Sequence, residues 1–156
     1  MSEAWSIRAL EAPDLPQLLE LYPHLNPSDE VPSLEVAGRR LADLRSYRGS
    51  EIFAGFVFGR MVSSCTLIVI PNLTRGGLPY GLIENVVTHT AHRGQGYGKE
   101  LLKVAAAAAW QASCYKVMLM TGSKQPATLA FYEAAGFEQS KTGFQMRRVP
   151  RRETLA

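Results

Sequence analysis

Cysteine and histidine are scarce in this chain of 156 residues. Its two cysteines, Cys65 and Cys114, have neither the spacing of a zinc site nor that of a disulfide framework. The three histidines, His24, His89 and His92, likewise lack ligand spacing, so the sequence predicts no metal site. We expect a protein of a reducing compartment.

Long apolar runs and blocks of like charge are also missing. No stretch approaches the ~18 apolar residues of a membrane-spanning helix, and residues 1–5 lack the pattern of a secretion signal. The net charge is only +3, without a run of five like charges, which argues against a nucleic-acid-binding tail. With 46% hydrophobic residues, we predict one domain over residues 1–150, a frayed tail over 151–156, and a cytoplasmic protein that binds neither nucleic acid nor membrane.

The hydrophobic pattern switches repeatedly between the period of strands and that of helices, which is typical of the α/β (α+β) class. Strands are predicted over residues 6–10, 51–58, 61–70, 82–88, 115–120, 137–139 and 142–149. Helices are predicted over 14–22, 33–44, 99–112 and 123–135. Ser33 is the expected N-cap of the second helix, Thr121 or Ser123 that of the fourth, and Gly136 ends the fourth.

A glycine-rich turn, Arg93-Gly-Gln-Gly-Tyr-Gly98, lies between an expected strand and an expected helix. Such a turn exposes backbone N–H groups at a helix N-terminus, where the helix dipole favours phosphate. The dinucleotide fingerprint is excluded because its third glycine would fall on Lys99. A Walker loop is excluded because Gly94 and Gly98 enclose three residues instead of four. The remaining pattern is Arg-x-x-Gly-x-Gly.

A second signature, Phe131-Tyr-Glu-Ala-Ala-Gly-Phe137, follows at a distance that accommodates a helix, a strand and a second helix. The two signatures in this order resemble the GNAT superfamily of acetyl-CoA-dependent N-acetyltransferases, over residues 82–148. The resemblance implies a mixed, mostly antiparallel sheet of about six to seven strands with about four helices, splayed between the fourth and fifth strands. It also implies that acetyl-CoA donates an acetyl group to a primary amine by direct attack.

The resemblance assigns roles to individual residues. Tyr132 would protonate the leaving thiolate, and the backbone of Val86, Val87 and Thr88 would pair with the pantetheine arm. The pyrophosphate would bind to the turn formed by Arg93, Gly94, Gln95, Gly96, Tyr97 and Gly98, and Lys124 is a further candidate for the cofactor phosphates.

Glu84 is an acid within an apolar strand, which is costly without a partner or a purpose. It is the candidate to accept the amine proton through water; the alternative is a structural carboxylate or one that only positions the acceptor. Cys114 could carry an acetyl group in a ping-pong mechanism, but no histidine lies nearby in sequence.

Within the superfamily, residues 83–87, 114–117 and 144–147 resemble eukaryotic-type glucosamine-6-phosphate N-acetyltransferases. The acceptor contacts that this resemblance implies are Glu84, Asn85, Tyr115, Lys116 and Arg147, and two chains would complete each site as a homodimer. The sequence departs from the pattern at Asn85 and Met120, where that enzyme has Asp. Other small amines, a protein lysine or N-terminus as acceptor, and a non-catalytic acetyl-CoA sensor remain alternatives.

Overall fold

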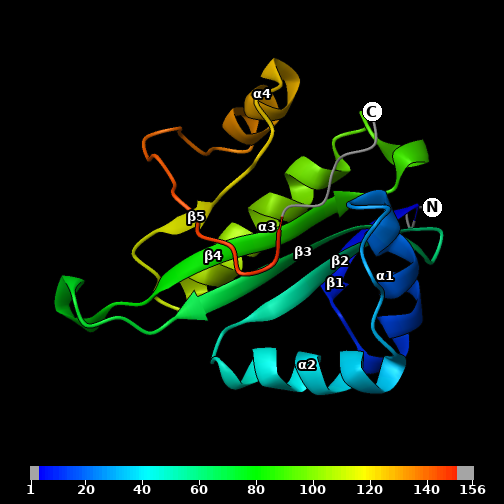
Figure 1. Ribbon diagram of the computed structural model, residues 1–156, viewed down its shortest axis with the longest axis horizontal. Coiled ribbons are helices and arrows are strands. Elements are labelled where there is room, and N and C mark those ends of the chain that lie inside the picture. The colour runs from blue at the N-terminus through cyan, green and yellow to red at the C-terminus, as the bar shows by residue number, and fades with distance from the viewer. Residues whose placement is uncertain (1–3, 151–156) are drawn as a thin grey trace.

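The computed structural model describes residues 4–150 and contains a five-stranded sheet with helices on both faces (Figure 1). The strands, in their order across the sheet, are β1 (Trp5–Ala9), β2 (Glu51–Val57), β3 (Arg60–Ile70), β4 (Tyr80–Thr88) and β5 (Val117–Leu119). The α-helices are α1 (Leu15–Leu21), α2 (Leu34–Ser46), α3 (Tyr97–Gln111) and α4 (Pro126–Ala134). Short 3-10 helices are η1 (Ala12–Asp14), η2 (Tyr22–His24), η3 (Arg75–Gly77) and η4 (Thr90–His92). The tail predicted to be frayed, residues 151–156, lies outside the described residues.

The sheet is mixed, as predicted: β1 to β4 pair in antiparallel fashion, and β4 and β5 run parallel. The predicted number of six to seven strands is wrong, because residues 137–139 and 142–149 form no strand and the sheet has five. Residues 138–150 are exposed throughout. A strand forms only where it pairs with a neighbouring edge, and within the described chain this segment pairs with none.

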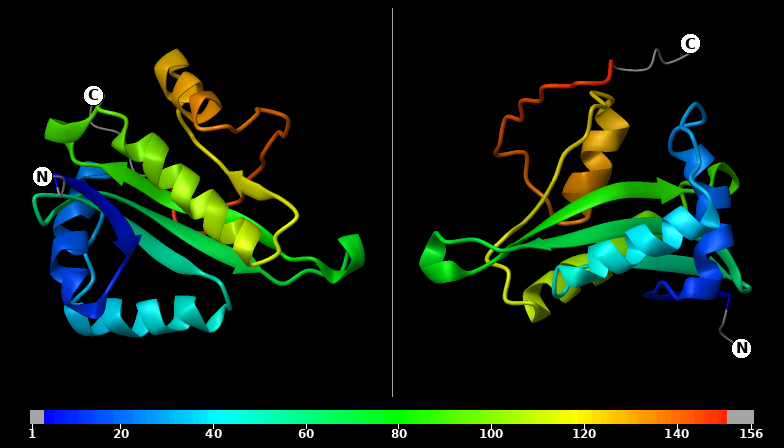
Figure 2. Two further views of the ribbon diagram at one scale, coloured as in Figure 1. Left: turned by 180° about the vertical axis from the view of Figure 1, so that it is seen from behind. Right: turned by 60° about the horizontal axis from the view of Figure 1, so that its bottom comes forward.

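Two hydrophobic cores lie on opposite faces of the sheet. One joins α1 and α2 to the sheet through side chains such as Leu18, Leu41 and Phe56. The other joins α3 to the sheet through side chains such as Leu67 and Leu102, and α4 packs against its margin. Figure 2 shows α3 lying across the face opposite α2. The functional elements therefore rest on a sheet that is covered on both sides.

Helix boundaries follow local chemistry. The Ser33 side chain accepts a hydrogen bond from the Val36 amide and caps α2, which confirms that prediction. The predicted cap of α4 is wrong, because Gln125 is the N-cap. The Ser123 hydroxyl accepts a hydrogen bond from the Gln125 amide and so lies just before the helix. Gly136, with a φ of 99°, follows the end of α4 as expected.

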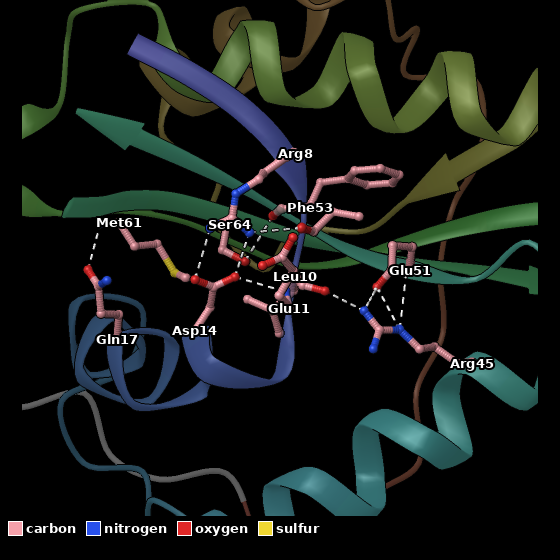
Figure 3. A network of polar contacts seen from close by, with 11 residues as sticks. Arg8, Leu10, Glu11, Asp14, Gln17, Arg45, Glu51, Phe53, Met61 and Ser64 are labelled. Carbon is pink, nitrogen blue, oxygen red and sulfur yellow. Dashed lines mark hydrogen bonds and ion pairs between the residues drawn. The ribbon is translucent and has the colours of Figure 1, made fainter. Parts of the chain in front are cut away.

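A polar network fixes the first half of the chain (Figure 3). The Arg8 guanidinium donates to both carboxylate oxygens of buried Asp14, at 2.6 and 3.0 Å, and the Glu11 amide donates to the same carboxylate at 2.8 Å. Arg45, on α2, donates to Glu51 at 2.9 Å and also to the Leu10 carbonyl. These contacts tie β1, η1, α2 and β2 together.

The sheet opens between β4 and β5, as predicted. The two strands pair only from Gly81 to Ile83 on the β4 side, so the rest of this edge of β4 has no strand partner. A bulge interrupts the other edge, because two residues of β4 lie opposite one of β3 between the pairs Thr66–Glu84 and Ser64–Val87. Asn85, in the bulge, has a left-handed φ of 53°, a conformation that asparagine tolerates better than most residues.

Candidate active site

A cleft of about 250 Å³ lies where β4 and β5 separate. It brings together residues that are far apart in sequence, among them the predicted Glu84, Asn85, Val86 and Tyr132. Its full lining is Leu25, Ile83, Glu84, Asn85, Val86, Leu119, Met120, Thr121, Gly122 and Tyr132. An acid on β4 and a phenol on α4 therefore share one cleft.

Tyr132 is half-buried in this cleft. Burial raises the pKa of its phenol, and the negative charge of Glu84 raises that pKa further. The phenol is consequently protonated throughout the physiological pH range. Such a group can donate a proton to a strong base that forms next to it.

The glycine turn leads directly into α3. Gly96 is the N-cap of this helix, and Gly94 and Gly96 have left-handed φ values of 76° and 84°. A Cβ at either position would meet no atom within 4 Å, so the backbone surface of the turn is open. Within residues 4–150, the amides of residues 94–96 donate to no other group. The turn thus fits a phosphate ligand.

Three residues of the turn are engaged within the chain itself. The Arg93 guanidinium donates to the carbonyls of Thr88, at 3.1 Å, and His24, at 2.8 Å. The Tyr97 ring stacks on Trp5 at a centroid distance of 4.2 Å. Gly98 needs its lack of a side chain for packing, because a Cβ there would lie 3.1 Å from the ring of Phe131. The open part of the turn is therefore its backbone.

The open edge of β4 supplies further backbone groups. The Val87 carbonyl accepts from the Ser63 hydroxyl at 3.0 Å, and the His89 amide donates to Val62, so odd-numbered residues here face β3. Because strand backbone groups alternate in direction, Val86 and Thr88 face the open side. Of the three residues predicted to pair with the cofactor, these two have the suitable direction, whereas Val87 is part of the core.

A second cleft of about 210 Å³ adjoins the first, and both are lined by Leu25 and Asn85. Its other lining residues are Tyr22, Pro23, Asn26, Asp29, Glu30, Val31 and Pro32. Together the two clefts are lined by the acids Glu84, Asp29 and Glu30 and by no lysine, arginine or histidine. Within the described chain, the combined space is therefore acidic.

The remaining predicted acceptor residues lie elsewhere. Tyr115 and Lys116 lie before β5, beside Tyr80, and the Lys116 ammonium is 5.4 Å from the centroid of the Tyr115 ring. Arg147 lies in the exposed segment after α4, and its Nε donates to Gln145 at 3.4 Å. The described chain does not bring these three residues to either cleft. Lys124 is exposed on the loop before α4.

Sequence reasoning missed the residues of the second cleft and the turn residues Thr121 and Gly122. No local signal identifies them, because their role depends on η2 lying against the end of β4.

The cysteines are buried, and burial raises the pKa of Cys65 to about 12 and also raises that of Cys114. The described residues contain no group of three potential ligands arranged for a metal ion. None of their helices is long and apolar enough to cross a bilayer.

A parallel strand pair that separates beside an open glycine turn, with a phenol and a carboxylate in the opening, is typical of acyltransferases that use a coenzyme A thioester. The sequence profile of the Acetyltransferase (GNAT) family matches residues 16–137. The chain belongs to this family, and as an N-acetyltransferase it uses acetyl-CoA as the acetyl donor.

Individual relatives agree with this assignment. The chain is 38% identical to the glucosamine 6-phosphate N-acetyltransferase of Trypanosoma brucei brucei over 133 residues, which cover 84% of this chain and 87% of the relative. A structure from Agrobacterium tumefaciens, provisionally named an acetyltransferase, is 50% identical with a TM-score of 0.85, over 92% of this chain and 99% of that one. The glucosamine-6-phosphate N-acetyltransferase of Arabidopsis thaliana is 26% identical with a TM-score of 0.79, over 94% of this chain and 99% of that one.

Proposed function

We propose that this N-acetyltransferase acetylates the primary amine of an amino sugar phosphate of the glucosamine 6-phosphate type. The observation that carries the catalytic part is the common cleft of Glu84 and Tyr132 at the opening of the sheet. The names of the trypanosome and Arabidopsis relatives support the acceptor class.

In the proposed reaction, both substrates are bound together and the amine nitrogen forms a bond to the acetyl carbon as the carbon–sulfur bond breaks. Glu84 accepts the proton of the amine, through water, and Tyr132 gives its proton to the departing sulfur. The Val86 and Thr88 backbone and the amides of the turn orient the donor, and one β4 amide polarises the thioester oxygen. Lys124 contributes charge near the phosphates.

Glu84→Gln tests the role of the carboxylate. We expect kcat to fall by about 10²-fold, the size of a general-base contribution, and the acidic limb of the pH–rate profile to be lost. Activity is measured as thiol release from acetyl-CoA with glucosamine 6-phosphate and with a panel of other amines. An acidic limb that is unchanged in the variant would remove Glu84 as the base and leave it as an acceptor-positioning residue.

We also propose that two copies of the chain form the active assembly. Phe144 and Met146 are 94% and 100% exposed on a segment whose sequence pattern is that of a strand. A second copy offers the backbone edge that this segment lacks, and it offers a route by which Lys116 and Arg147 reach an acidic cleft that binds a phosphorylated acceptor.

Sedimentation equilibrium tests this proposal, with about twice the 17.2 kDa of one chain as the expected mass. Met146→Ser combined with Phe144→Ser is expected to give the single-chain mass and to raise the KM for glucosamine 6-phosphate. The matched control is Phe58→Ser, because Phe58 is 81% exposed in the turn between β2 and β3, far from this segment. A single-chain mass for the unmodified protein would reject the assembly.

The acidic lining of the two clefts favours one other acceptor, a cationic amine without phosphate such as a polyamine. The same amine panel separates the two: turnover of polyamines with no turnover of glucosamine 6-phosphate would establish the second acceptor. Thiol release with none of the amines, together with tight acetyl-CoA binding, would favour a non-catalytic sensor.

The organisation of the chain as a single domain over residues 1–150 and its location in the cytoplasm are part of the same proposal. Two buried thiols without a disulfide support a reducing compartment. The two acceptor classes named above are small molecules, so the proposal requires neither nucleic acid nor membrane.

A further inference from the structure

His24 joins two segments that are distant in sequence. It is the last residue of η2, and the next two residues, Leu25 and Asn26, line the second cleft. Its carbonyl accepts from the Arg93 guanidinium at 2.8 Å. Its ring Nδ1 lies 3.4 Å from the Thr90 amide and 3.3 Å from the Thr90 hydroxyl. One residue therefore attaches the loop of the second cleft to the segment that enters the glycine turn.

The imidazole rings reinforce this attachment. The His24 ring lies against that of His89 with a centroid distance of 3.9 Å, and His89 continues to His92 at 5.6 Å. Arg93 also donates to the Thr88 carbonyl at 3.1 Å, so its guanidinium bridges the end of β4 and η2. Arg93 is the first residue of the turn, so its hydrogen bond to the His24 carbonyl connects the turn directly to η2.

We infer that His24 is a positioning residue that couples occupancy of the phosphate turn to the shape of the acceptor loop, residues 25–32. Binding of the cofactor fixes the turn, Arg93 and Thr90 then hold His24, and the loop takes the conformation that receives the acceptor. This inference rests on the proposed function, because it assigns the second cleft to the acceptor.

The attachment requires neutral imidazoles. The Nδ1 atoms of His24 and His89 accept from the amides of Thr90 and Ala91, and a protonated Nδ1 cannot accept. Burial lowers the pKa of His89, and so do the positive charges that face it. The groups that lower it in their charged forms are His24 on η2, His92 on η4, Arg60 on β3 and Arg93 at the start of the turn. The contact of His89 with the Ala91 amide is therefore expected near neutral pH and is weakened by acidification.

Hydrogen exchange of the full-length protein, with and without coenzyme A, reads the coupling without any catalysis. In the unmodified protein, coenzyme A is expected to slow amide exchange in residues 25–31 at about pH 7.5, and less so at about pH 5.5. His24→Ala is expected to abolish this slowing while the turn is still protected. His92→Ala is the matched control, because His92 belongs to the same stack but lies on the far side of His89.

Steady-state kinetics supply the second measurement. His24→Ala is expected to raise the acceptor KM about fivefold to tenfold, the effect of losing one or two neutral hydrogen bonds. Its kcat and its KM for acetyl-CoA should stay within about twofold, because only acceptor binding is lost. His24→Asn is expected to restore the acceptor KM, because its amide oxygen can accept from Thr90 in place of Nδ1. If His24→Ala does not fold, Thr90→Ala replaces it in these measurements, because this substitution removes only the hydroxyl contact to His24.

The outcomes separate this inference from the proposed function. If coenzyme A slows exchange in the loop but no amine is acetylated, the coupling stands and the proposed function fails. If amines are acetylated while both His24→Ala and Thr90→Ala leave the acceptor KM and the loop protection unchanged, the coupling is overturned. Equal changes in the acceptor and acetyl-CoA KM values would also overturn it, because they would indicate a general structural role.

Discussion

The two halves of the sheet are built differently. All four salt bridges among residues 4–150 join side chains within the segment from Arg8 to Glu51. In the same half, β3 is buried over most of its length. By contrast, β5 has only three residues, α4 has no fully buried residue, and the segment after it is exposed. The half that contains these ion pairs, here called the cross-linked half, contributes to the clefts only through residues 22–32, whereas the open half, which contains Glu84 and Tyr132, is more exposed.

This difference has a physical basis. A site that receives a pantetheine arm must leave backbone groups of β4 unpaired, and unpaired groups do not contribute to stability. The cross-linked half, including the Arg8–Asp14 pair, supplies the stability that the open half lacks. Substitutions in the cross-linked half outside residues 22–32 should therefore change stability, and substitutions in the open half should change activity.

Tyr132→Phe should have the largest effect and only on activity. We expect kcat to fall by about 10²- to 10³-fold, because the sulfur then leaves without a proton donor. The substitution keeps the aromatic ring that packs at the margin of the α3 core, so thermal unfolding should hardly change. The measurements are thiol release at saturating substrates and calorimetric unfolding. A variant with unchanged kcat would exclude Tyr132 from the mechanism.

Asp14→Ala should lower the stability of the protein and leave its activity unchanged. The buried carboxylate accepts from the Arg8 guanidinium and the Glu11 amide, and its loss should lower the free energy of unfolding by about 2 kcal/mol. Urea denaturation measures this, and kcat in the absence of urea should not change. In the control Asp43→Ala, which breaks an exposed pair with Arg40, the loss should stay below about 0.5 kcal/mol. Equal losses would show that burial does not distinguish the pairs.

Two glycine-to-alanine substitutions compare the halves directly. A Cβ at Gly55 would lie 2.1 Å from the Trp5 ring, and relieving this overlap should cost about 1–3 kcal/mol of stability. A Cβ at Gly98 would lie 3.1 Å from Phe131, which a small shift of α4 can relieve. Alanine also favours the helix, so Gly98→Ala should keep its stability and raise the acetyl-CoA KM severalfold. Reversed effects would contradict the contrast between the halves.

Lowering the pH should reduce the stability that the Arg8–Asp14 pair gives to the cross-linked half. The hydrogen bond from Arg8, helped by the Glu11 amide, lowers the pKa of Asp14. The unfolded chain then binds this proton more readily, so the stabilisation is present above the unfolded pKa of about 4 and is lost as pH falls through the folded value. The stability difference between the unmodified protein and Asp14→Ala should shrink as the pH falls below about 4. Parallel curves would exclude this linkage.

Local rules predicted the cross-linked half well. The Ser33 cap and the hairpin of β2 and β3 depend on residues close in sequence, and both form. The glycine turn between β4 and α3 was predicted for the same reason, because glycines with left-handed φ lie just before the start of α3. Its phosphate ligand stays a prediction. Where neighbours in sequence decide the conformation, the pattern is sufficient.

The open half was predicted less well, since its structure depends on distant partners. The pattern of residues 142–149 is that of a strand, but a strand needs an adjacent edge. Gly98 also packs against Phe131, a contact between α3 and α4 that the glycine pattern did not predict, and its role in binding the cofactor stays a prediction. The contact of His24 with Thr90 spans 66 positions in sequence, and no periodicity encodes it.

The burial of both native thiols has a practical consequence for the bench. With a pKa of about 12 at Cys65 and a raised pKa at Cys114, neither sulfur should react appreciably with a chromogenic disulfide reagent near neutrality. The colour produced during turnover would then report released coenzyme A without background from the enzyme. A single cysteine engineered into the acceptor loop could likewise be labelled with a fluorophore without first replacing the native pair.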